Sequence, residues 1–229
     1  MSEVRRVLLV GATGLVGTRI MQACVGRSDL RLIALTRREA PMPQGARMEM
    51  LVADPAEWEQ SLATVAPDAV ICALGTTWRR AGRDEAAFRA VDQELVLRVA
   101  RAAKAIGVSN FVLVSSVGAD MASRTLYLRL KSEVETALRK LRFHRLDILR
   151  PGLLRGPRSG DRRPAERLAI ILSPLLNLVL HGERRRLRAI DAGVVARAAL
   201  EGAKEKARGT FVHEHDAILR LERRLAPAG

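Results

Sequence analysis

Short apolar runs alternate with longer amphipathic stretches along most of the chain. The runs are rich in Val, Ile and Leu, a composition typical of strands that are buried on both faces. The strands that this pattern predicts are Arg5–Val10, Leu30–Thr36, Met48–Ala53, Ala69–Ala73, Asn110–Ser115 and Arg145–Arg150. Strands that alternate with helices form a parallel sheet with helices on both faces, so the pattern predicts an α/β fold.

The amphipathic stretches between these strands predict the helices Leu15–Val25, Ala56–Ala63, Glu85–Ile106 and Leu126–Leu141. The third helix should break near Asp92, which suits an N-cap for the run that follows it, and Gly107 suits the C-terminal stop. Right-handed crossovers then give a doubly wound parallel sheet. The C-terminal ends of its strands face one crevice, which is where ligands bind in such sheets.

The alternation weakens after Pro151. A loop rich in Gly, Pro and Arg comes first, and further short elements follow. These elements are a strand near Leu187–Ile190, a helix over Ala192–Glu205, a strand over Thr210–His213 and a final helix with Asp216 as its N-cap. We expect residues 1–229 to form a single domain in which 152–229 supplies most of a small C-terminal, substrate-side lobe.

Composition narrows the class of protein. Hydrophobic residues make up 48% of the 229 residues, enough for a large core. Cys24 and Cys72 lie in apolar contexts, which indicates reduced core thiols. The first predicted strand starts at Arg5 and leaves no room for a signal peptide, so we expect a cytoplasmic protein.

The net charge of +14 raises the question of a nucleic-acid partner. The basic residues are mostly Arg and are spread along the chain, and aromatic residues, at 3%, offer little surface for stacking on bases. We therefore predict no specific nucleic-acid partner. The apolar run Leu168–Leu180 contains Pro174 and is too short to span a bilayer. It could cover a pocket or meet a partner, which leaves a homodimer or a protein partner open.

The first strand ends in a glycine-rich turn. Gly11, Gly14 and Gly17 have the spacing G-x-x-G-x-x-G and lead into a helix. Glycines let a backbone approach phosphates closely, and a helix N-terminus points unpaired N–H groups at them. The turn predicts a site for a dinucleotide pyrophosphate, the alternative being an ordinary strand–helix turn. A P-loop is excluded because no Lys-Ser or Lys-Thr follows Gly17.

The ends of the next two strands bear on the choice of dinucleotide. Arg37 and Arg38 stand where NAD-binding proteins place an acidic residue, and two guanidinium groups could grip a 2′-phosphate. NADP(H) is therefore favoured over NAD(H), although Glu39 follows directly and argues the other way. Asp54 could accept a hydrogen bond from the adenine amine, or it could cap a helix that begins at Pro55.

A catalytic constellation follows on the remaining strands. Gly75 ends the fourth strand and could allow close approach to a ribose, or form a simple turn. Tyr127 and Lys131 are spaced i, i+4 and so share a helix face. The ammonium would stabilise the phenolate form of the tyrosine, which makes the pair a proton donor and acceptor for carbonyl reduction. A hydroxyl of the pair Ser115–Ser116 could orient the substrate oxygen.

Taken together, these motifs resemble an atypical short-chain dehydrogenase/reductase, and within that superfamily the Tat-interacting oxidoreductase-like proteins. The segments that carry the resemblance are Leu74–Thr77, Ser115–Asp120, Leu126–Leu128, Lys131–Glu135 and Arg150–Leu154. The resemblance implies a Rossmann fold and an NADP(H)-dependent oxidoreductase that acts on a small carbonyl or hydroxyl compound. A non-catalytic NADP(H)-sensing protein that regulates a partner is the alternative.

The resemblance also implies roles for individual residues. Tyr127 would donate or accept the proton, Lys131 would hold the nicotinamide ribose, and Ser116 would complete the catalytic set. The residues that would contact the cofactor, with the glycine turn included, are Gly11, Thr13, Gly14, Leu15, Val16, Gly17, Arg37, Arg38, Leu74, Gly75, Leu154 and Arg162. Among these, Leu154 and Arg162 would lie near the nicotinamide.

His213 and His215 alternate on a predicted strand exit and could face the same way. A metal site needs more ligands than two, and no third ligand is evident nearby. We therefore predict no metal site.

Overall fold

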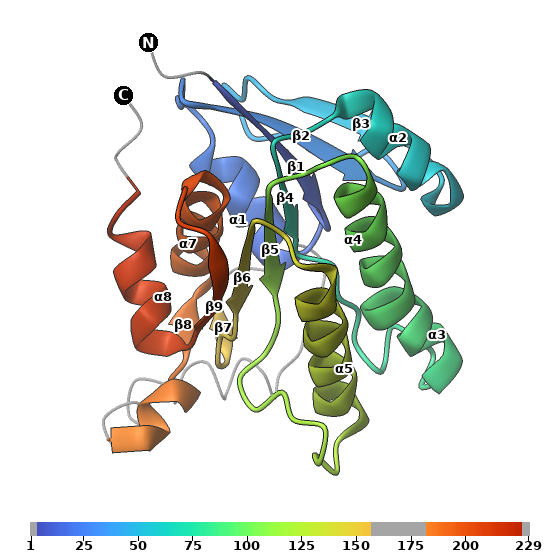
Figure 1. Ribbon diagram of the computed structural model, residues 1–229, viewed down its shortest axis with the longest axis vertical. Helices are drawn as coiled ribbons and strands as arrows, with labels where there is room; N and C mark the ends of the chain where they lie inside the picture. Colours follow the sequence, from blue (N-terminus) through green and yellow to red (C-terminus); the bar gives the residue numbers. More distant parts are fainter. Residues whose placement is uncertain (1–3, 157–181, 226–229) are drawn as a thin grey trace.

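The computed structural model describes residues 4–156 and 182–225. Its centre is a seven-stranded sheet in the order β3-β2-β1-β4-β5-β6-β9, in which every neighbouring pair is parallel (Figure 1). The strands are β1 (Arg5–Val10), β2 (Leu30–Thr36), β3 (Glu49–Val52), β4 (Ala69–Cys72), β5 (Asn110–Val114), β6 (Arg145–Leu149) and β9 (Gly209–His213). A second, two-stranded sheet pairs β7 (Leu154–Arg155) with β8 (Ile190–Asp191).

Helices cover both faces of the large sheet. The helices α1, α7 and α8 lie on one face, and α2, α3, α4 and α5 lie on the other (Figure 1). Their bounds are α1 (Leu15–Ala23), α2 (Trp58–Val65), α3 (Glu85–Arg89), α4 (Val96–Ala105), α5 (Leu126–Leu141), α7 (Ala192–Lys204) and α8 (His215–Glu222). Short 3₁₀ turns cover Pro55–Glu57 and Gly182–Leu187, and a π-helical turn, Ala90–Leu95, joins α3 to α4.

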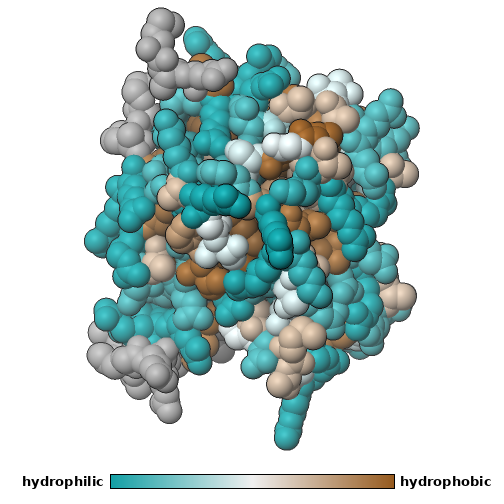
Figure 2. Space-filling model, viewed as in Figure 1, coloured by the Kyte–Doolittle hydropathy of each residue, from teal (hydrophilic) through white to brown (hydrophobic). Residues whose placement is uncertain are grey.

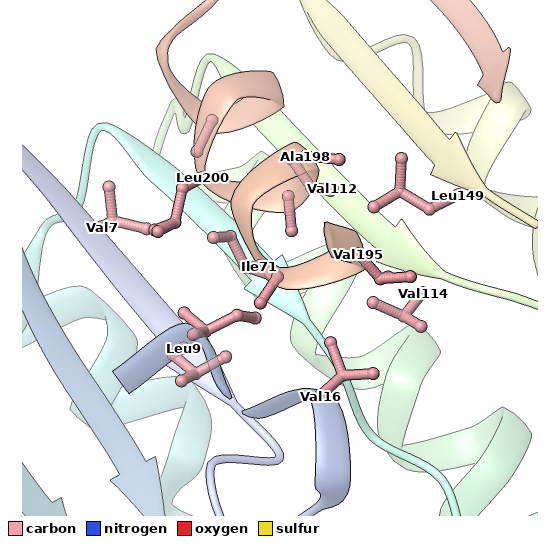
Figure 3. Packing of buried hydrophobic residues seen from close by; sticks show 14 of the residues in the cluster. Val7, Leu9, Val16, Ile71, Val112, Val114, Leu149, Val195, Ala198 and Leu200 are labelled. Carbon is pink, nitrogen blue, oxygen red and sulfur yellow. The ribbon is translucent and has the colours of Figure 1, made fainter. Parts of the chain in front are cut away.

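The unbroken apolar runs are explained by burial on both faces of the strands. Within β1, Val7 and Leu9 pack into the core on the α1 and α7 face, which Figure 3 shows from close by. The alternate residues, Leu8 and Val10, pack into the core on the opposite face. Hydrophilic residues cover most of the outer face shown in Figure 2. The predicted doubly wound parallel sheet is therefore confirmed.

The strand order reverses between β1 and β4, because the chain leaves β1 in one direction for β2 and returns to the other side for β4. At such a switch point the loops after the two strands diverge and leave a crevice at their C-terminal ends. The glycine turn follows β1, and Leu74–Thr77 follow β4, so the topology brings both segments to this crevice.

Two predicted caps are wrong. Asp92 does not begin a helix but lies inside the π-helical turn, where its side chain is buried. Glu214, not Asp216, is the N-cap residue of α8, and the Asp216 carboxylate instead accepts a hydrogen bond from His215 Nδ1. Both errors arise because a short acidic side chain before an amphipathic run is typical of a cap but also serves side-chain partners.

The C-terminal third contributes to the main sheet. α7 packs against α1, and β9 pairs with β6 at the edge of the sheet. The assignment of 152–229 to a substrate-side lobe stays a prediction. Arg162 and the run Leu168–Leu180 lie outside the described residues. Among the described helices, none has both the length and the apolar character needed to cross a bilayer.

Candidate functional site

The glycine turn is shaped by close backbone packing. Gly11 has a positive φ of 88°, and a Cβ placed there would lie 2.5 Å from the carbonyl carbon and oxygen of Ala73, just after β4. A Cβ on Gly17 would overlap the carbonyl oxygen of Gly11. These two glycines therefore let α1 and the end of β4 approach the turn.

The N-terminus of α1 faces this turn without a side-chain cap. Gly14 is the N-cap residue, it has no side chain to offer, and the first turn contains no acidic residue. The first N–H groups of a helix have no partner within the helix and carry partial positive charge. An anionic group such as a pyrophosphate would accept hydrogen bonds from these N–H groups and balance their partial positive charge.

Two cavities open at the switch point. The larger has a volume of about 820 Å³ and extends from the glycine turn past the end of β4 to α5. The smaller, about 610 Å³, extends from the same turn to the end of β2. The residues that line both are Thr13, Gly14, Ala73, Leu74, Gly75, Thr76 and Arg80. A dinucleotide has the same two-part form, with its pyrophosphate between the halves.

The smaller cavity is basic at one end. Arg37 and Arg38 line it, whereas Glu39 does not, and none of the described residues around it is acidic. Asp54 lies outside its lining, and Asp54 Oδ1 accepts a hydrogen bond of 2.8 Å from Ala56 N. The geometry thus favours the capping alternative for Asp54 over an adenine contact.

Tyr127 and Lys131 line the larger cavity from the first turns of α5. Lys131 Nζ lies 5.6 Å from the centre of the Tyr127 ring. The Tyr127 side chain is 37% exposed, whereas Lys131 is buried. The sequence spacing correctly placed the two side chains on one face of the helix.

Asp92 holds the lysine, and its place in the site was missed from the sequence. Lys131 Nζ lies 3.0 Å from Asp92 Oδ1, and Thr76 N donates a hydrogen bond of 2.6 Å to Asp92 Oδ2. Burial lowers the pKa of Lys131, but the charges of Tyr127 and Asp92 and the hydrogen bond with Asp92 outweigh this effect and raise the pKa above its ordinary value. The signal in the sequence that could have revealed this role was an acidic residue on the inner face of a long predicted helix.

The two serines after β5 have different partners. Ser115 lines the larger cavity, and its hydroxyl donates a hydrogen bond of 2.6 Å to the buried Glu135. Arg150 binds the same carboxylate, and this hydrogen bond raises the pKa of Arg150 above its ordinary value despite partial burial. Ser116 is not among the lining residues, and its hydroxyl donates to Val117 O at 3.3 Å. The Glu135 network ties α5 to the ends of β5 and β6.

Two further lining residues of the cavities belong to the site. Leu154, on β7, lines the larger cavity as expected from the sequence. Arg80 lines both cavities from the loop between β4 and α3, and no sequence pattern pointed to it. A cradle of backbone groups, an uncapped helix and four arginines along the cavities together fit an anionic dinucleotide.

The two histidines near the C-terminus turn to different partners. His213 Nε2 lies 2.7 Å from Asp147 Oδ1, and His215 Nδ1 lies 2.9 Å from Asp216 Oδ1. Over residues 4–156 and 182–225, no three His, Cys, Asp or Glu side chains are grouped so as to hold a metal ion.

Comparison with known proteins agrees with this geometry. A family model described as NAD(P)H-binding matches residues 11–168. The chain belongs to this NAD(P)H-binding family. It is 33% identical over 210 residues to "Protein fmp52, mitochondrial" of Emericella nidulans, covering 89% of each chain. It is 36% identical over 170 residues to "Protein HTATIP2" of Rattus norvegicus, covering 72% of this chain and 69% of the relative.

Solved structures of other NAD-binding or epimerase proteins share the fold. One is MoeE5 in complex with UDP-glucuronic acid and NAD, with a TM-score of 0.68, 20% identity and coverage of 90% of this chain and 75% of that one. Another is UDP-N-acetylglucosamine 4-epimerase from Bacillus cereus, with a TM-score of 0.65, 18% identity and coverage of 96% and 82%. These likenesses confirm the Rossmann fold.

The expectation of a cytoplasmic protein is wrong by the same comparisons. The fmp52 relatives, among them those of Emericella nidulans and Aspergillus niger, carry the word mitochondrial in their names. The expectation rested on the absence of a secretory signal, which does not separate the cytoplasm from other compartments that such a signal does not serve.

Proposed function

We propose that this protein is an NADP(H)-dependent oxidoreductase that interconverts a carbonyl and a hydroxyl group on a small molecule. The observation that carries the proposal is that Tyr127 and Lys131 line the same cavity as the glycine turn. A proton-transferring pair thus lies within reach of the space where one half of a dinucleotide fits. When bound there, the nicotinamide would supply or accept the hydride.

The preference for NADP(H) rests on Arg37 and Arg38. Both line the smaller cavity beside the buried Thr36, at the end of β2. Paired guanidinium donors match the oxygens of a phosphate, whereas the 2′-hydroxyl of NAD(H) favours an acidic partner at this place. The absence of an acidic residue from the described lining supports the same choice.

The remaining steps belong to residues of the chain. Tyr127 would give its hydroxyl proton to the substrate oxygen during reduction and take it back during oxidation. The Lys131 ammonium, fixed by Asp92, would stabilise the phenolate that forms and bind the nicotinamide ribose. Because the pKa of Lys131 lies above its ordinary value, the ammonium stays charged across the neutral range.

Ser116 remains our proposal for the hydroxyl that orients the substrate oxygen. A serine has one proton to donate, and Ser115 donates it to the buried Glu135 at 2.6 Å. The Ser116 hydroxyl makes only a long bond of 3.3 Å and is the less committed of the two, although it would have to turn into the larger cavity, which Ser115 and not Ser116 lines. Ser116→Ala should therefore lower kcat, whereas Ser115→Ala should mainly lower stability.

The test is the Tyr127→Phe variant. It keeps the ring and its contact with Phe88 but removes the proton donor. We expect NADPH affinity, measured by calorimetry, to stay within about twofold and turnover of a carbonyl panel to fall by at least about 100-fold. Unchanged turnover would rule out this mechanism. If the wild type binds NADPH, turns over nothing and binds a protein partner only when loaded, the sensing alternative replaces catalysis.

A further inference from the structure

Aromatic side chains are scarce in this chain, yet three of them meet on one wall of the larger cavity. The chain contains two Trp, one Tyr and four Phe. Trp78, Phe88 and Tyr127 all line this cavity. The rings of Trp78 and Phe88 lie 5.9 Å apart in an edge-to-face contact, and those of Phe88 and Tyr127 lie 6.2 Å apart. The three rings thus form a continuous strip that ends at the proposed proton donor.

The strip is supported from behind and exposed in front. Phe88, on α3, is buried at 2% exposure and separates the other two rings. Trp78, in the loop after β4, is 45% exposed, and Tyr127 is 37% exposed. Leaving such large apolar surfaces in water is unfavourable, and exposed aromatic surface on a cavity wall is typical of a binding site.

The described lining of this cavity offers few of the carboxylate and amide groups that would hold a polyhydroxylated substrate. Among the described lining residues there is no Glu or Asn, and the one carboxylate, Asp92, is held by Lys131 and Thr76 N. On α1, Arg19 donates a hydrogen bond of 2.6 Å to Gln22, so part of their polar capacity is used between themselves. Apart from Ser and Thr hydroxyls and backbone groups, sugar hydroxyls would therefore find few side-chain acceptors among the described lining residues.

We propose that the substrate is a planar aromatic or conjugated aldehyde or ketone whose ring stacks along Trp78 and whose carbonyl oxygen lies at Tyr127. The inference rests on the proposed function and specifies its substrate class. In the reduction, the carbonyl carbon gains a hydride from the reduced nicotinamide dinucleotide, the C=O π bond breaks, and its electron pair on oxygen takes the Tyr127 proton. The products are an alcohol and the oxidised dinucleotide.

The experiment compares two probes of the same carbon skeleton, 2-naphthaldehyde and decahydronaphthalene-2-carbaldehyde, which differ in the aromaticity of the rings. We expect the wild type to show a KM about tenfold lower for the aromatic probe, a difference that matches the contribution of an aromatic contact. Calorimetry with the corresponding alcohols in the presence of NADPH, a pair that cannot exchange a hydride, should give the same ratio of Kd values without turnover.

Variants of the loop locate the effect. Trp78→Leu should abolish the aromatic preference in both KM and Kd, and Trp78→Phe should keep most of the preference. Arg79→Leu is the matched control, because Arg79 neighbours Trp78 but does not line the cavity. It should leave the preference intact.

The outcomes separate the two proposals. A wild type that binds no NADPH overturns the proposed function and this inference with it. A wild type that binds NADPH but treats both probes alike, keeps its preference in Trp78→Leu, or binds UDP-glucose more tightly than the aromatic alcohol overturns the substrate class alone.

Discussion

Lys131 and Asp92 form a buried ion pair that is central to the proposed chemistry. Its carboxylate joins the end of β4, through Thr76 N, to α5, through Lys131 Nζ. Two charges that are both buried are tolerated because each compensates the other. The side chain that holds the lysine of the proposed catalytic pair is thus also part of the packing of the domain.

Asp92→Asn should affect stability and pH dependence together. The substitution leaves the Lys131 charge without its buried counter-charge, so we expect the free energy of unfolding to fall by about 3–5 kcal/mol. It also removes one cause of the raised pKa of Lys131, so the alkaline limb of the kcat profile should move to lower pH. Urea titration and a pH–rate profile measure the two effects.

Glu85→Gln is the control for this prediction. Glu85 pairs with Arg89 on the surface of α3, and exposed ion pairs contribute less than about 1 kcal/mol. An Asp92→Asn variant with the stability and alkaline limb of the wild type would show that Asp92 does not hold Lys131.

The arginines of the two cavities should separate the parts of the dinucleotide. Arg37→Gln and Arg38→Gln should each weaken NADPH binding by about 10-fold or more and leave NADH binding nearly unchanged, because only NADPH carries the 2′-phosphate. Arg80, which lines both cavities, should contribute to both cofactors, so Arg80→Gln should weaken both alike. Calorimetric titrations provide the values, and equal losses for both cofactors in Arg37→Gln and Arg38→Gln would contradict the NADP(H) preference.

At the scale of elements, regular periodicity was predictable and local irregularity was not. The bounds of β1, β2 and α5 agree with the prediction, because each is a long segment with one unbroken pattern. The π-helical turn around Asp92 was not predictable, since the partner of its buried carboxylate, Lys131, comes from a distant segment.

In the candidate site, too, the local sequence patterns were predictable and the contributions of irregular loops were not. The glycine turn and the Tyr127–Lys131 spacing are local patterns, and their residues meet as expected. Arg80 and Trp78 reach the cavities through the conformation of an irregular loop, which no periodicity encodes. The choice between Ser115 and Ser116 likewise depends on Glu135, a partner that only the packed structure reveals.

Gly17→Ala tests the packing of α1 against the glycine turn. In an exposed helix this change would be stabilising by about 1 kcal/mol. Here the added Cβ would overlap the carbonyl oxygen of Gly11, which is backbone and cannot turn away. We expect a loss of about 1–3 kcal/mol in the free energy of unfolding and weaker NADPH binding. Gln22→Ala on the same helix should change stability little, and a stabilised Gly17→Ala variant would contradict the packing argument.

At the scale of the whole molecule, an ion pair and a hydrogen bond join the N-terminal part of the chain to the end of α7. Asp29, in the turn between α1 and β2, binds Arg27 at 2.6 Å and Lys204 of α7 at 2.5 Å. Arg5 Nη1 donates a hydrogen bond to Lys204 O at the same place. These contacts therefore join β1 and the turn after α1 to the end of α7, in addition to the apolar packing of α1 on α7.

This closure predicts sensitivity to acid. Burial raises the pKa of Asp29, but hydrogen bonds and charges from Arg27 and Lys204 outweigh it, and the pKa falls from 3.8 to about 2. A carboxylate with a lowered pKa in the folded state contributes stability above its unfolded pKa and loses it as the pH falls. The urea midpoint should therefore drop between pH 4 and pH 2, the window set by these two values.

Asp29→Asn isolates this contribution. The variant should be less stable than the wild type at pH 7 and should show a smaller further loss between pH 4 and pH 2. Glu94→Gln, a change at an exposed carboxylate of the π-helical turn, should follow the wild-type curve. An Asp29→Asn curve parallel to that of the wild type would contradict the argument.

The distribution of the two tryptophans has a practical consequence for optical measurements. Trp58 lines the smaller cavity and Trp78 lines the larger one. In the proposed binding mode, each half of the dinucleotide therefore lies beside its own intrinsic fluorophore. A chain that retains only Trp58 would report the adenosine half by its emission, and one that retains only Trp78 would report the nicotinamide half. The order in which the two halves engage could then be followed by stopped flow without any added label.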